Sequence, residues 1–345
     1  MSVSEQASGS ALPPHEEAPL LEVRDVHVSF SGRTGLLSGL MGKEGEVARA
    51  VDGVSLSIAA GEIVALAGES GCGKTTLARS IMGLERPGRG EIAFKGEPLG
   101  KRLRDYRRRV QMVFQDPSGA LNPRQTIYES VAEGLRIHRV PGDEEKLVAQ
   151  ALSHAGLRPP ERFYLLYPHE VSGGQRQRVV IAGALALGPE LLVADEPVSM
   201  LDASVRGEIL RLLLKLRDEL GLAILVVTHD LGLAWTVADR VAVMYLGRIV
   251  ELGPAEDVLT RPLHPYTRAL LEIVPEAGGL GRNLLQGEPP DPTRIPPGCR
   301  FHPRCPEVAS GRSAALGMEH KCKGEDLPLA EHRPGHWAAC HLIGC

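Results

Sequence analysis

The first part of the chain alternates apolar and polar residues in a way that predicts β-strands. Residues 20–30, LLEVRDVHVSF, place an apolar side chain at nearly every second position, which is typical of a half-buried strand. A second pair of strands is expected at residues 47–58 and 62–67. Residues 63–66 of the last strand form the short apolar run of a buried parallel strand, and it stops at Gly68.

Further along, the pattern divides the chain into an α/β core, a helical insert and a C-terminal segment. Alternating strands and helices are typical of a parallel α/β sheet, and we expect them at residues 74–82, 110–114, 191–195, 204–220 and 223–228. From about residue 116 to 189, helical periodicity replaces the strands, with helices predicted at residues 126–138, 143–155 and 175–186. Beyond about Pro254 the chain is rich in Pro and Gly, which predicts a separate appendage.

Composition excludes several classes of protein. A chain of 345 residues is long enough for one large or two modest domains. Its net charge of −4 provides no bulk positive field to hold nucleic acid or an anionic membrane. Every apolar stretch is shorter than the roughly 18 residues that span a bilayer. Residues 1–19 lack the basic start and apolar stretch of a signal peptide, and we expect a disordered cytoplasmic tail.

One short segment is strongly cationic. Residues 101–109, KRLRDYRRR, hold six Lys or Arg side chains, a density that occurs in nucleic-acid binding patches. Because the whole chain is slightly acidic, we favour an amphipathic, solvated helix that pairs with nearby acidic residues. No nucleic-acid partner is therefore expected.

A glycine-rich stretch between a predicted strand and a predicted helix has the spacing of a phosphate-binding loop, G-x-x-x-x-G-K-T. Its glycines let backbone N–H groups wrap the phosphates, Lys74 reaches the β- and γ-phosphates, and Thr75 can ligate Mg²⁺. A chance glycine-rich turn is the alternative, and the flanking elements disfavour it. Cys72 is interpreted as a tolerated small residue rather than a redox group. The expected nucleotide-binding residues are Gly68, Glu69, Ser70, Gly71, Cys72, Gly73, Lys74, Thr75 and Thr76.

Two carboxylates follow the apolar strand LLVAD at residues 191–195. Beside a phosphate loop, Asp195 can hold the Mg²⁺ shell while Glu196 polarises a water for attack on the γ-phosphate. Two acids are common at ordinary strand ends, so this interpretation depends on the loop.

Further sequence segments indicate which class of nucleotide-binding protein this chain belongs to. VSGGQ, at residues 171–175, opens a predicted helix whose free backbone N–H groups can bind an anion. Gln115 and His229 each follow an apolar strand, and SMLD, at residues 199–202, comes just after Glu196. Singly each piece is weak, since a histidine is more often structural. Their combination and order are not accidental.

Together these segments resemble the ATP-binding subunit of an ABC transporter, in the oligopeptide, dipeptide and nickel importer branch. The resemblance covers nearly everything from residue 20 onward and is carried by GESGCGKTT (68–76), QMVFQDPSGALNPR (111–124), YPHEVSGGQRQRV (167–179) and ADEPVSMLD (194–202). It implies an α/β P-loop NTPase of the ABC type, with a parallel sheet core, an antiparallel β subdomain, a helical insert and a small cysteine-containing C-terminal extension. The implied divisions are a tail at 1–19, a nucleotide-binding domain at 20–260 with its insert at about 116–189, and an extension at 261–345.

The resemblance also implies an ATP site shared between two subunits paired head to tail. Ser172 and Gly174 would meet the γ-phosphate bound on the opposite subunit, and Asp202 would touch the partner. Phe30 stands where the family places an aromatic that stacks on adenine, although a strand-end core residue is nearly as good an interpretation. The implied catalytic residues are Glu196, His229 and Gln115; the Mg²⁺ ligands are Thr75, Gln115 and Asp195; and the nucleotide contacts further include Gly173 and Gln175.

ATP hydrolysis that powers import of peptides or a related small solute is the implied function. The implied partners are a second ATPase subunit in a hetero-pair, two transmembrane permease subunits and an extracytoplasmic solute-binding protein, at the cytoplasmic face of the membrane. A soluble ABC ATPase of DNA repair or translation is the alternative. The short span from Lys74 to Ser172 leaves no room for the coiled coil of repair types, and each motif occurs once. The C-terminal segment, which resembles that of peptide importers, argues against an exporter.

Three positions depart from the family pattern without removing a catalytic group. Val171 stands where Leu or Phe is frequent, Gly183 where an Arg is usual, and Met200 where a small residue is usual. The last makes the fit to the partner less certain.

Five of the six cysteines lie near the C-terminus. Because a cytosolic chain seldom keeps disulfides, this cluster indicates a metal, and the segments 264–275 and 298–306 resemble the extension of the same importer branch, which can carry four cysteines. Thiolates favour iron–sulfur clusters or zinc, and the spacing C-x5-C-x16-C-x17-C lacks the tight pairs of zinc ribbons. We therefore favour a four-iron four-sulfur cluster over zinc, with Cys299, Cys305, Cys322 and Cys340 as ligands. Cys345 is interpreted as a spare thiol, and as surface residues we interpret His302, His320, His332, His336 and His341.

Overall fold

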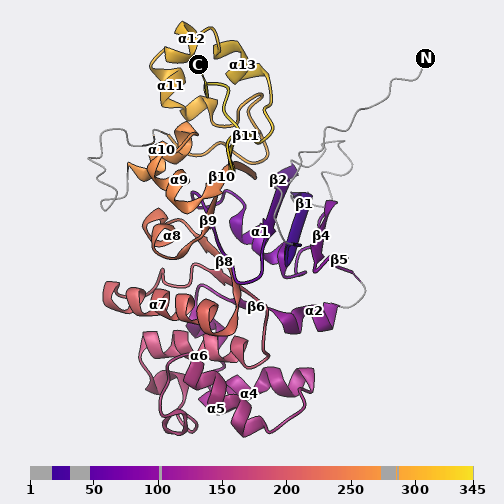
Figure 1. Cartoon of the computed structure of the whole chain (residues 1–345), viewed down its shortest axis with the longest axis vertical. Helices are drawn as coiled ribbons and strands as arrows, with labels where there is room; N and C mark the ends of the chain where they lie inside the picture. The colour runs from indigo at the N-terminus through magenta and orange to yellow at the C-terminus, as the bar shows by residue number, and fades with distance from the viewer. Residues whose placement is uncertain (1–17, 32–46, 101–102, 273–284, 286, 345) are drawn as a thin grey trace, which may run out of the picture.

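Two β-sheets organise the chain. The structure is a computed structural model, and it describes residues 18–31, 47–100, 103–272, 285 and 287–344. Most of the expected N-terminal tail, and Cys345, lie outside these residues. An eight-stranded sheet has the strand order β11-β12-β10-β9-β3-β8-β7-β6, and a four-stranded sheet has the order β2-β1-β4-β5. In Figure 1 the sheets lie between the C-terminal segment at the top and helices α4 to α6 at the bottom.

The larger sheet contains the parallel core that the sequence predicted. Its strands are β3 (Ile63–Ala67), β6 (Val110–Val113), β7 (Leu191–Asp195), β8 (Ala223–Thr228), β9 (Arg240–Tyr245), β10 (Arg248–Pro254), β11 (Ala330–Arg333) and β12 (His336–Ala338). From β9 through β3, β8 and β7 to β6 the neighbours are parallel. The strands β10, β12 and β11 continue the sheet in antiparallel fashion.

The smaller sheet is the antiparallel β subdomain. It consists of β1 (Leu21–Ser31), β2 (Val47–Ile58), β4 (Arg89–Phe94) and β5 (Glu97–Pro98). The consecutive strands β2 and β3 therefore do not pair, although the sequence treats them as a pair. β2 aligns along β1 from Val47 to Ile58, whereas every residue of β3 is buried, as a parallel strand covered on both faces must be.

Helices fill the connections between strands. They are α1 (Lys74–Ile81), α2 (Leu103–Arg109), α3 (Pro117–Ala120), α4 (Ile127–His138), α5 (Glu144–His154), α6 (Gly173–Leu185), α7 (Ala203–Leu220), α8 (Leu231–Val237), α9 (Ala255–Thr260), α10 (Pro265–Leu271), α11 (Pro306–Ala309), α12 (Arg312–Ala315) and α13 (Glu319–Gly324), with 3-10 turns at Pro160–Arg162, Pro168–Glu170 and His302–Arg304. None of the helices in the described ranges is long and apolar enough to traverse a bilayer.

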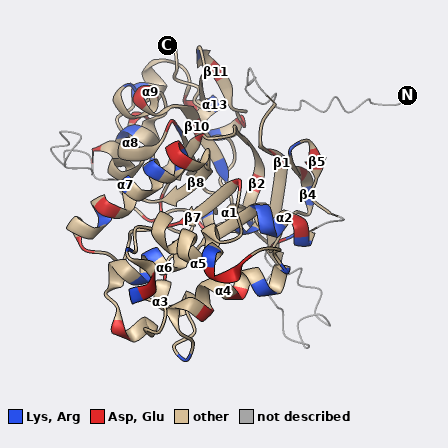
Figure 2. Cartoon of the chain, turned by 60° about the horizontal axis from the view of Figure 1, so that its bottom comes forward, with Lys and Arg blue, Asp and Glu red and all other residues tan. Residues whose placement is uncertain are grey.

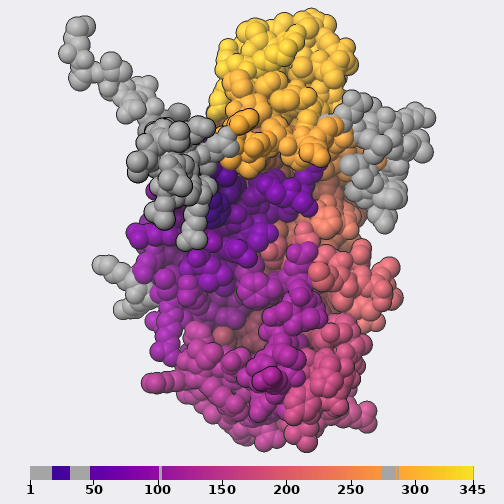
Figure 3. Space-filling view, turned by 180° about the vertical axis from the view of Figure 1, so that it is seen from behind, coloured from indigo at the N-terminus to yellow at the C-terminus, as the bar shows by residue number. Residues whose placement is uncertain are grey.

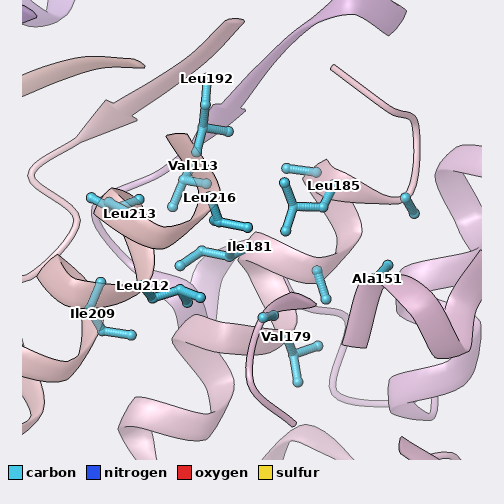
Figure 4. Packing of buried hydrophobic residues seen from close by; sticks show 14 of the residues in the cluster. Val113, Ala151, Val179, Ile181, Leu185, Leu192, Ile209, Leu212, Leu213 and Leu216 are labelled. Atoms are coloured by element: carbon cyan, nitrogen blue, oxygen red, sulfur yellow. The ribbon is translucent and has the colours of Figure 1, made fainter. Parts of the chain in front are cut away.

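The helical insert packs on one face of the parallel sheet. Helix α4 begins at Thr126, whose side chain forms a capping box with Glu129, a local signal that fixes the start of a helix. In Figure 4, apolar side chains from α6 and α7 meet Leu192 of β7 and Val113 of β6. This core fixes the insert against the strands that carry the site.

Arginines of α2 are engaged within the chain. Arg107 donates to the Gly83 carbonyl at 2.7 Å, and Arg109 donates to Glu190 at 2.6 Å and lies over the Phe94 ring. Figure 2 shows acidic and basic segments interspersed along the helices. The expected pairing of this cationic helix with a nearby acid is therefore present.

The segment beyond Pro254, expected to be a separate appendage, is joined to the core. Strand β12 pairs with β10, and Phe301 is buried beside Tyr245. Figure 3 shows the segment packed directly on the rest of the molecule. His336 is fully buried and lies 2.7 Å from Glu251, so its interpretation as a surface histidine is wrong. The contact with Glu251 on β10 satisfies one nitrogen of this buried ring, Nε2.

Candidate nucleotide-binding site

Polar residues converge at one edge of the parallel sheet. Strand β3 leads into the phosphate loop, β6 leads to Gln115, β7 ends in Asp195 before Glu196, and His229 follows β8. Because these strands are parallel neighbours in the order β3-β8-β7-β6, their carboxyl ends meet at the same edge. Ligands of open α/β sheets bind at this edge.

The phosphate loop has a backbone that only glycine accommodates. Gly73 has a φ of 107°, and a Cβ there would lie 2.0 Å from the Ala50 carbonyl oxygen. The buried ammonium of Lys74 donates to the Gly68 and Glu69 carbonyls at 2.7 and 2.8 Å. A cation and the start of α1 therefore stand together where phosphate would bind.

Asp195 and Thr75 form the part of the site suited to a divalent cation. The Thr75 hydroxyl donates to the Asp195 carboxylate at 3.5 Å. Burial raises the pKa of Asp195, and the bond from Thr75 opposes that rise. A nearby cation would stabilise the charged form of this carboxylate, and carboxylate and hydroxyl oxygens are hard ligands of the kind Mg²⁺ takes. The donor set therefore fits Mg²⁺.

Glu196 is held by two side chains from neighbouring strand ends. Gln115 Nε2 donates to Glu196 Oε2 at 2.8 Å, and His229 Nδ1 lies 3.0 Å from Glu196 Oε1. Since an ionised carboxylate only accepts hydrogen bonds, Nδ1 carries the proton in that pair. Glu196 also has a φ of 46°, an uncommon conformation for a residue other than glycine. Such strain clusters at functional sites.

The VSGGQ segment starts α6. The Ser172 hydroxyl accepts from the Gln175 N–H at 3.3 Å, and the Gln175 side chain accepts from the Ser172 N–H at 3.0 Å. Gly174 faces α7 so closely that a Cβ would lie 2.5 Å from Val205. Within the described ranges, no hydrogen bond or ion pair links this segment to the chain's own phosphate loop.

Two predicted residues lie exposed at the edges of this region. Asp202 is exposed at the start of α7 and makes no side-chain capping bond. Phe30, near the end of β1, is 44% exposed, unlike an ordinary core aromatic. Met200, which the family pattern disfavours, is 64% exposed.

The four predicted cysteine ligands line one small cavity of about 10 Å³, which also contacts His264. Burial raises the pKa of all four thiols, to about 11 for Cys299 and about 12 for Cys340. As they are placed, the described residues contain no group of three or more His, Cys, Asp or Glu side chains able to hold a metal ion. The thiols are gathered but not arranged as a ligand shell.

Two residues that sequence reasoning missed reach the phosphate loop from the C-terminal segment. The Glu69 N–H donates to the Tyr266 hydroxyl at 2.9 Å, and Arg304 binds the Glu69 carboxylate through both terminal nitrogens. Both lie in the segments that resemble the importer extension, but nothing in their spacing places them beside residue 69.

This geometry defines a P-loop ATPase site, and comparisons with known proteins agree. Residues 51–199 match the ABC transporter family, and residues 250–311 match the oligopeptide/dipeptide transporter C-terminal region. The oligopeptide transport ATP-binding protein AppF of Bacillus subtilis is 42% identical over 335 residues, which are 94% of this chain and 97% of AppF. A putative peptide import ATP-binding protein of Brucella ovis is 42% identical over 94% of this chain and 98% of its own. The chain therefore belongs to the ATP-binding proteins of ABC transporters.

Solved structures share the fold. The cbiO1 protein of Clostridium perfringens, part of an ABC transporter complex, has a TM-score of 0.62 and 30% identity over 77% of this chain and 99% of its own. The ATP-binding cassette MJ0796, in a dimeric post-hydrolysis state bound to ADP and Pi, has a TM-score of 0.58 and 31% identity over 68% of this chain and 98% of its own. The α/β P-loop fold expected from the sequence is confirmed.

Proposed function

We propose that this chain is the ATP-hydrolysing subunit of a peptide importer, with Glu196 as the base that activates water. The observation that carries the proposal is the pair of contacts from Gln115 and His229 to the Glu196 carboxylate, beside Asp195 and the phosphate loop. The names of the relatives in peptide and oligopeptide transport support the solute class.

In the proposed reaction, the oxygen of a water attacks the γ-phosphorus of ATP and the bond to the β-phosphate oxygen breaks, which releases ADP. Glu196 accepts the proton of that water. The two contacts hold its carboxylate in one orientation. His229 would also contact the γ-phosphate. Lys74 would exchange its carbonyl contacts for phosphate oxygens.

Thr75, Asp195 and Gln115 would hold Mg²⁺ in the same site. The ion neutralises charge on the phosphate oxygens when bound. Phe30 is the proposed platform for adenine, because its side chain is 44% exposed and an aromatic ring has a π-face that can stack. The remaining loop residues, other than Glu69 and Cys72, whose N–H groups donate within the chain, would contribute backbone N–H groups toward phosphate.

A second ATPase subunit would complete the site. Ser172, Gly173 and Gly174 make no contact with the phosphate loop of their own chain in the described ranges, and Asp202 and Met200 are exposed. We propose that this face meets the phosphate loop of a paired subunit, in a hetero-pair. The dimeric state of MJ0796 supports pairing through this fold.

Assembly with two permease subunits and an extracytoplasmic solute-binding protein, on the cytoplasmic face of the membrane, belongs to the same proposal. The proposed division of the chain remains a tail at 1–19, a nucleotide-binding domain at 20–260 and an extension at 261–345. Purification from native membranes tests the assembly: two polytopic membrane proteins are expected to accompany the chain. Recovery with DNA-repair or ribosomal proteins instead would favour the soluble ABC ATPase.

Phosphate release tests catalysis. The purified assembly is expected to hydrolyse ATP far faster than the isolated chain at equal concentration, because Ser172 acts on a neighbouring subunit. Lys74→Ala in the assembly is the inactive control, since it removes a charge that binds phosphate. Equal rates for dilute isolated chain and assembly would overturn the shared site.

For the cysteines we propose metal binding, with a four-iron four-sulfur cluster favoured and zinc as the alternative. Four thiols that line one cavity support it. A volume of about 10 Å³ is close to that of one water-sized probe, so the lining must open to admit a cluster. Because burial keeps these thiols protonated, metal uptake would release protons.

Anaerobic purification tests the metal. About four irons per chain, with broad absorbance near about 400 nm, are expected for the cluster. Cys299→Ser is expected to remove both signals while nucleotide binding continues. One equivalent of zinc without iron would identify the alternative, and neither metal would overturn the site.

A further inference from the structure

We propose that Arg304 and Tyr266 are positioning residues for the phosphate loop, through which the C-terminal segment sets nucleotide affinity. This inference rests on the proposed nucleotide-binding function. It concerns Glu69, the second residue of the loop, whose backbone and side-chain polar groups are all engaged by buried partners.

Contacts to Glu69 come from two parts of the chain, the phosphate loop itself and the C-terminal segment. Its carbonyl accepts from Lys74 Nζ at 2.8 Å, within the loop. Its N–H donates to the Tyr266 hydroxyl at 2.9 Å, and its carboxylate accepts from Arg304 Nη1 and Nη2 at 2.6 and 3.0 Å. Two of the three groups are therefore held by the C-terminal segment, and the third holds the lysine that would bind phosphate.

Arg304 and Tyr266, together called the clamp, have little freedom to move. The Arg304 side chain is 5% exposed, and Tyr266 is fully buried. The Tyr266 ring lies 4.6 Å from the Tyr245 ring and 5.3 Å from that of Phe301, and the guanidinium of Arg304 lies over Tyr245 at 6.0 Å. A bidentate pair fixed by such packing sets orientation as well as charge.

The charge of Glu69 explains why the clamp bears on affinity. A free carboxylate in a loop that receives phosphates repels them, and the repulsion is largest where water is scarce. Arg304 neutralises this carboxylate and holds it in one direction. Loss of the guanidinium would leave an unpaired anion beside the phosphate site and release the first turn of the loop.

Arg304 also links the loop to the cysteine cavity, because it directly precedes Cys305 in the chain. The turn His302–Arg304 and Cys305 are joined by backbone hydrogen bonds, including Cys305 N–H to the His302 carbonyl. A displacement of this turn would carry the guanidinium with it. A change at the cysteine cavity would therefore reach the ATP site through Arg304.

Binding of a fluorescent ATP analogue with Mg²⁺ to the full chain tests the proposal, together with KM and kcat of the assembly. Arg304→Gln is expected to raise Kd and KM by about fivefold or more while kcat changes little. Arg304→Lys is expected to fall between this variant and the wild type, because it keeps the charge but not the fork. Tyr266→Phe is expected to give a smaller increase.

Asp326→Asn is the matched control. Arg248 binds Asp326 through both carboxylate oxygens at 2.6 Å, so this variant also breaks an Arg–carboxylate link between the core and the C-terminal segment, but away from the phosphate loop. It is expected to leave Kd unchanged. An equal rise in Kd for Asp326→Asn and Arg304→Gln would assign the effect to general loosening and overturn the proposal.

The double variant Glu69→Gln with Arg304→Gln separates charge from folding. It leaves no charge unpaired, so it is expected to recover most of the affinity lost in Arg304→Gln. It also keeps the proposal testable if the single variant Arg304→Gln fails to fold. A Kd of Arg304→Gln within twofold of wild type would overturn the clamp. Failure of the proposed function differs, since wild type and Lys74→Ala would then bind the analogue equally poorly.

Discussion

Glu196 combines a strained backbone with a doubly held carboxylate. Its φ of 46° costs of order 1–3 kcal/mol, and the contacts from Gln115 and His229 use both carboxylate oxygens. A residue that served only to cap a strand would need neither feature. The arrangement is expected of a general base whose carboxylate must face the attacking water in one orientation.

Glu196→Gln is expected to leave ATP affinity nearly unchanged and to lower turnover of the assembly by about 100-fold or more, because the amide cannot accept the proton of the attacking water. Phosphate release and nucleotide binding are measured on the same preparation. Glu190→Gln is the control: this carboxylate precedes the other end of β7 and pairs with Arg109, and its loss should spare turnover. Wild-type hydrolysis by Glu196→Gln would remove Glu196 as the base.

Sequence patterns predicted the residues that gather at one edge of the sheet, because the loop spacing and the strand-end carboxylates are local features. Gly174 shows the limit. The sequence assigns it to phosphate contact, and the structure adds a packing reason, since α7 leaves no room for a Cβ. Arg304 and Tyr266 were missed because their contact with Glu69 depends on tertiary folding alone.

Among the elements, helices α4 and α7 differ in whether the side chain before the first turn forms a capping hydrogen bond. The Thr126 side chain bonds the backbone of Glu129 at the start of α4, whereas Asp202 occupies the same position before α7 without such a bond. Residues of the capping class normally bond there. An unused cap at a long helix is consistent with the proposed partner contact of Asp202.

Thr126→Ala is therefore expected to lower the free energy of unfolding by about 1 kcal/mol, and Asp202→Ala by only a few tenths, through the helix dipole. Urea denaturation of the isolated chain measures both. In the assembly the order should reverse, with Asp202→Ala reducing ATP turnover and Thr126→Ala sparing it. A large stability loss for Asp202→Ala would assign it an ordinary capping role.

Periodicity predicted the elements around the site but not their pairing. The helices α4, α5, α6 and α7 were expected within a few residues of their observed ends. Strands β9 and β10 were not predicted, although β9 is a parallel neighbour of β3. β2 pairs with β1, the strand that precedes it, whereas β3 pairs with β8 and β9, which lie far along the chain. No local pattern encodes that choice.

For the whole molecule, a buried histidine couples stability to pH. Burial lowers the pKa of His264 to about 4 from its usual 6.5. Below about pH 6.5, His264 binds a proton in the unfolded chain, whereas in the folded chain it stays neutral until about pH 4. This group therefore lowers the free energy of unfolding as pH falls through that window, by about 1.4 kcal/mol per pH unit.

His264→Asn is expected to flatten this dependence, because Asn can still accept the bond from the Tyr266 N–H but does not titrate. Urea midpoints between pH 4.5 and pH 7 measure the slope. His169→Asn is the control at an exposed histidine and is expected to keep the wild-type slope. Identical slopes for all three proteins would show that another group governs the acid limit.

The contact between Glu69 and Arg304 joins residues 235 positions apart, and this has a consequence for the chain as it is made. At about 5 to 20 residues per second, the ribosome adds Arg304 roughly 10 to 50 s after Glu69. Through this interval the nascent chain carries a phosphate loop without its clamp. If Arg304 sets nucleotide affinity as proposed, a chain terminated before residue 304 would bind ATP about fivefold more weakly than a finished subunit.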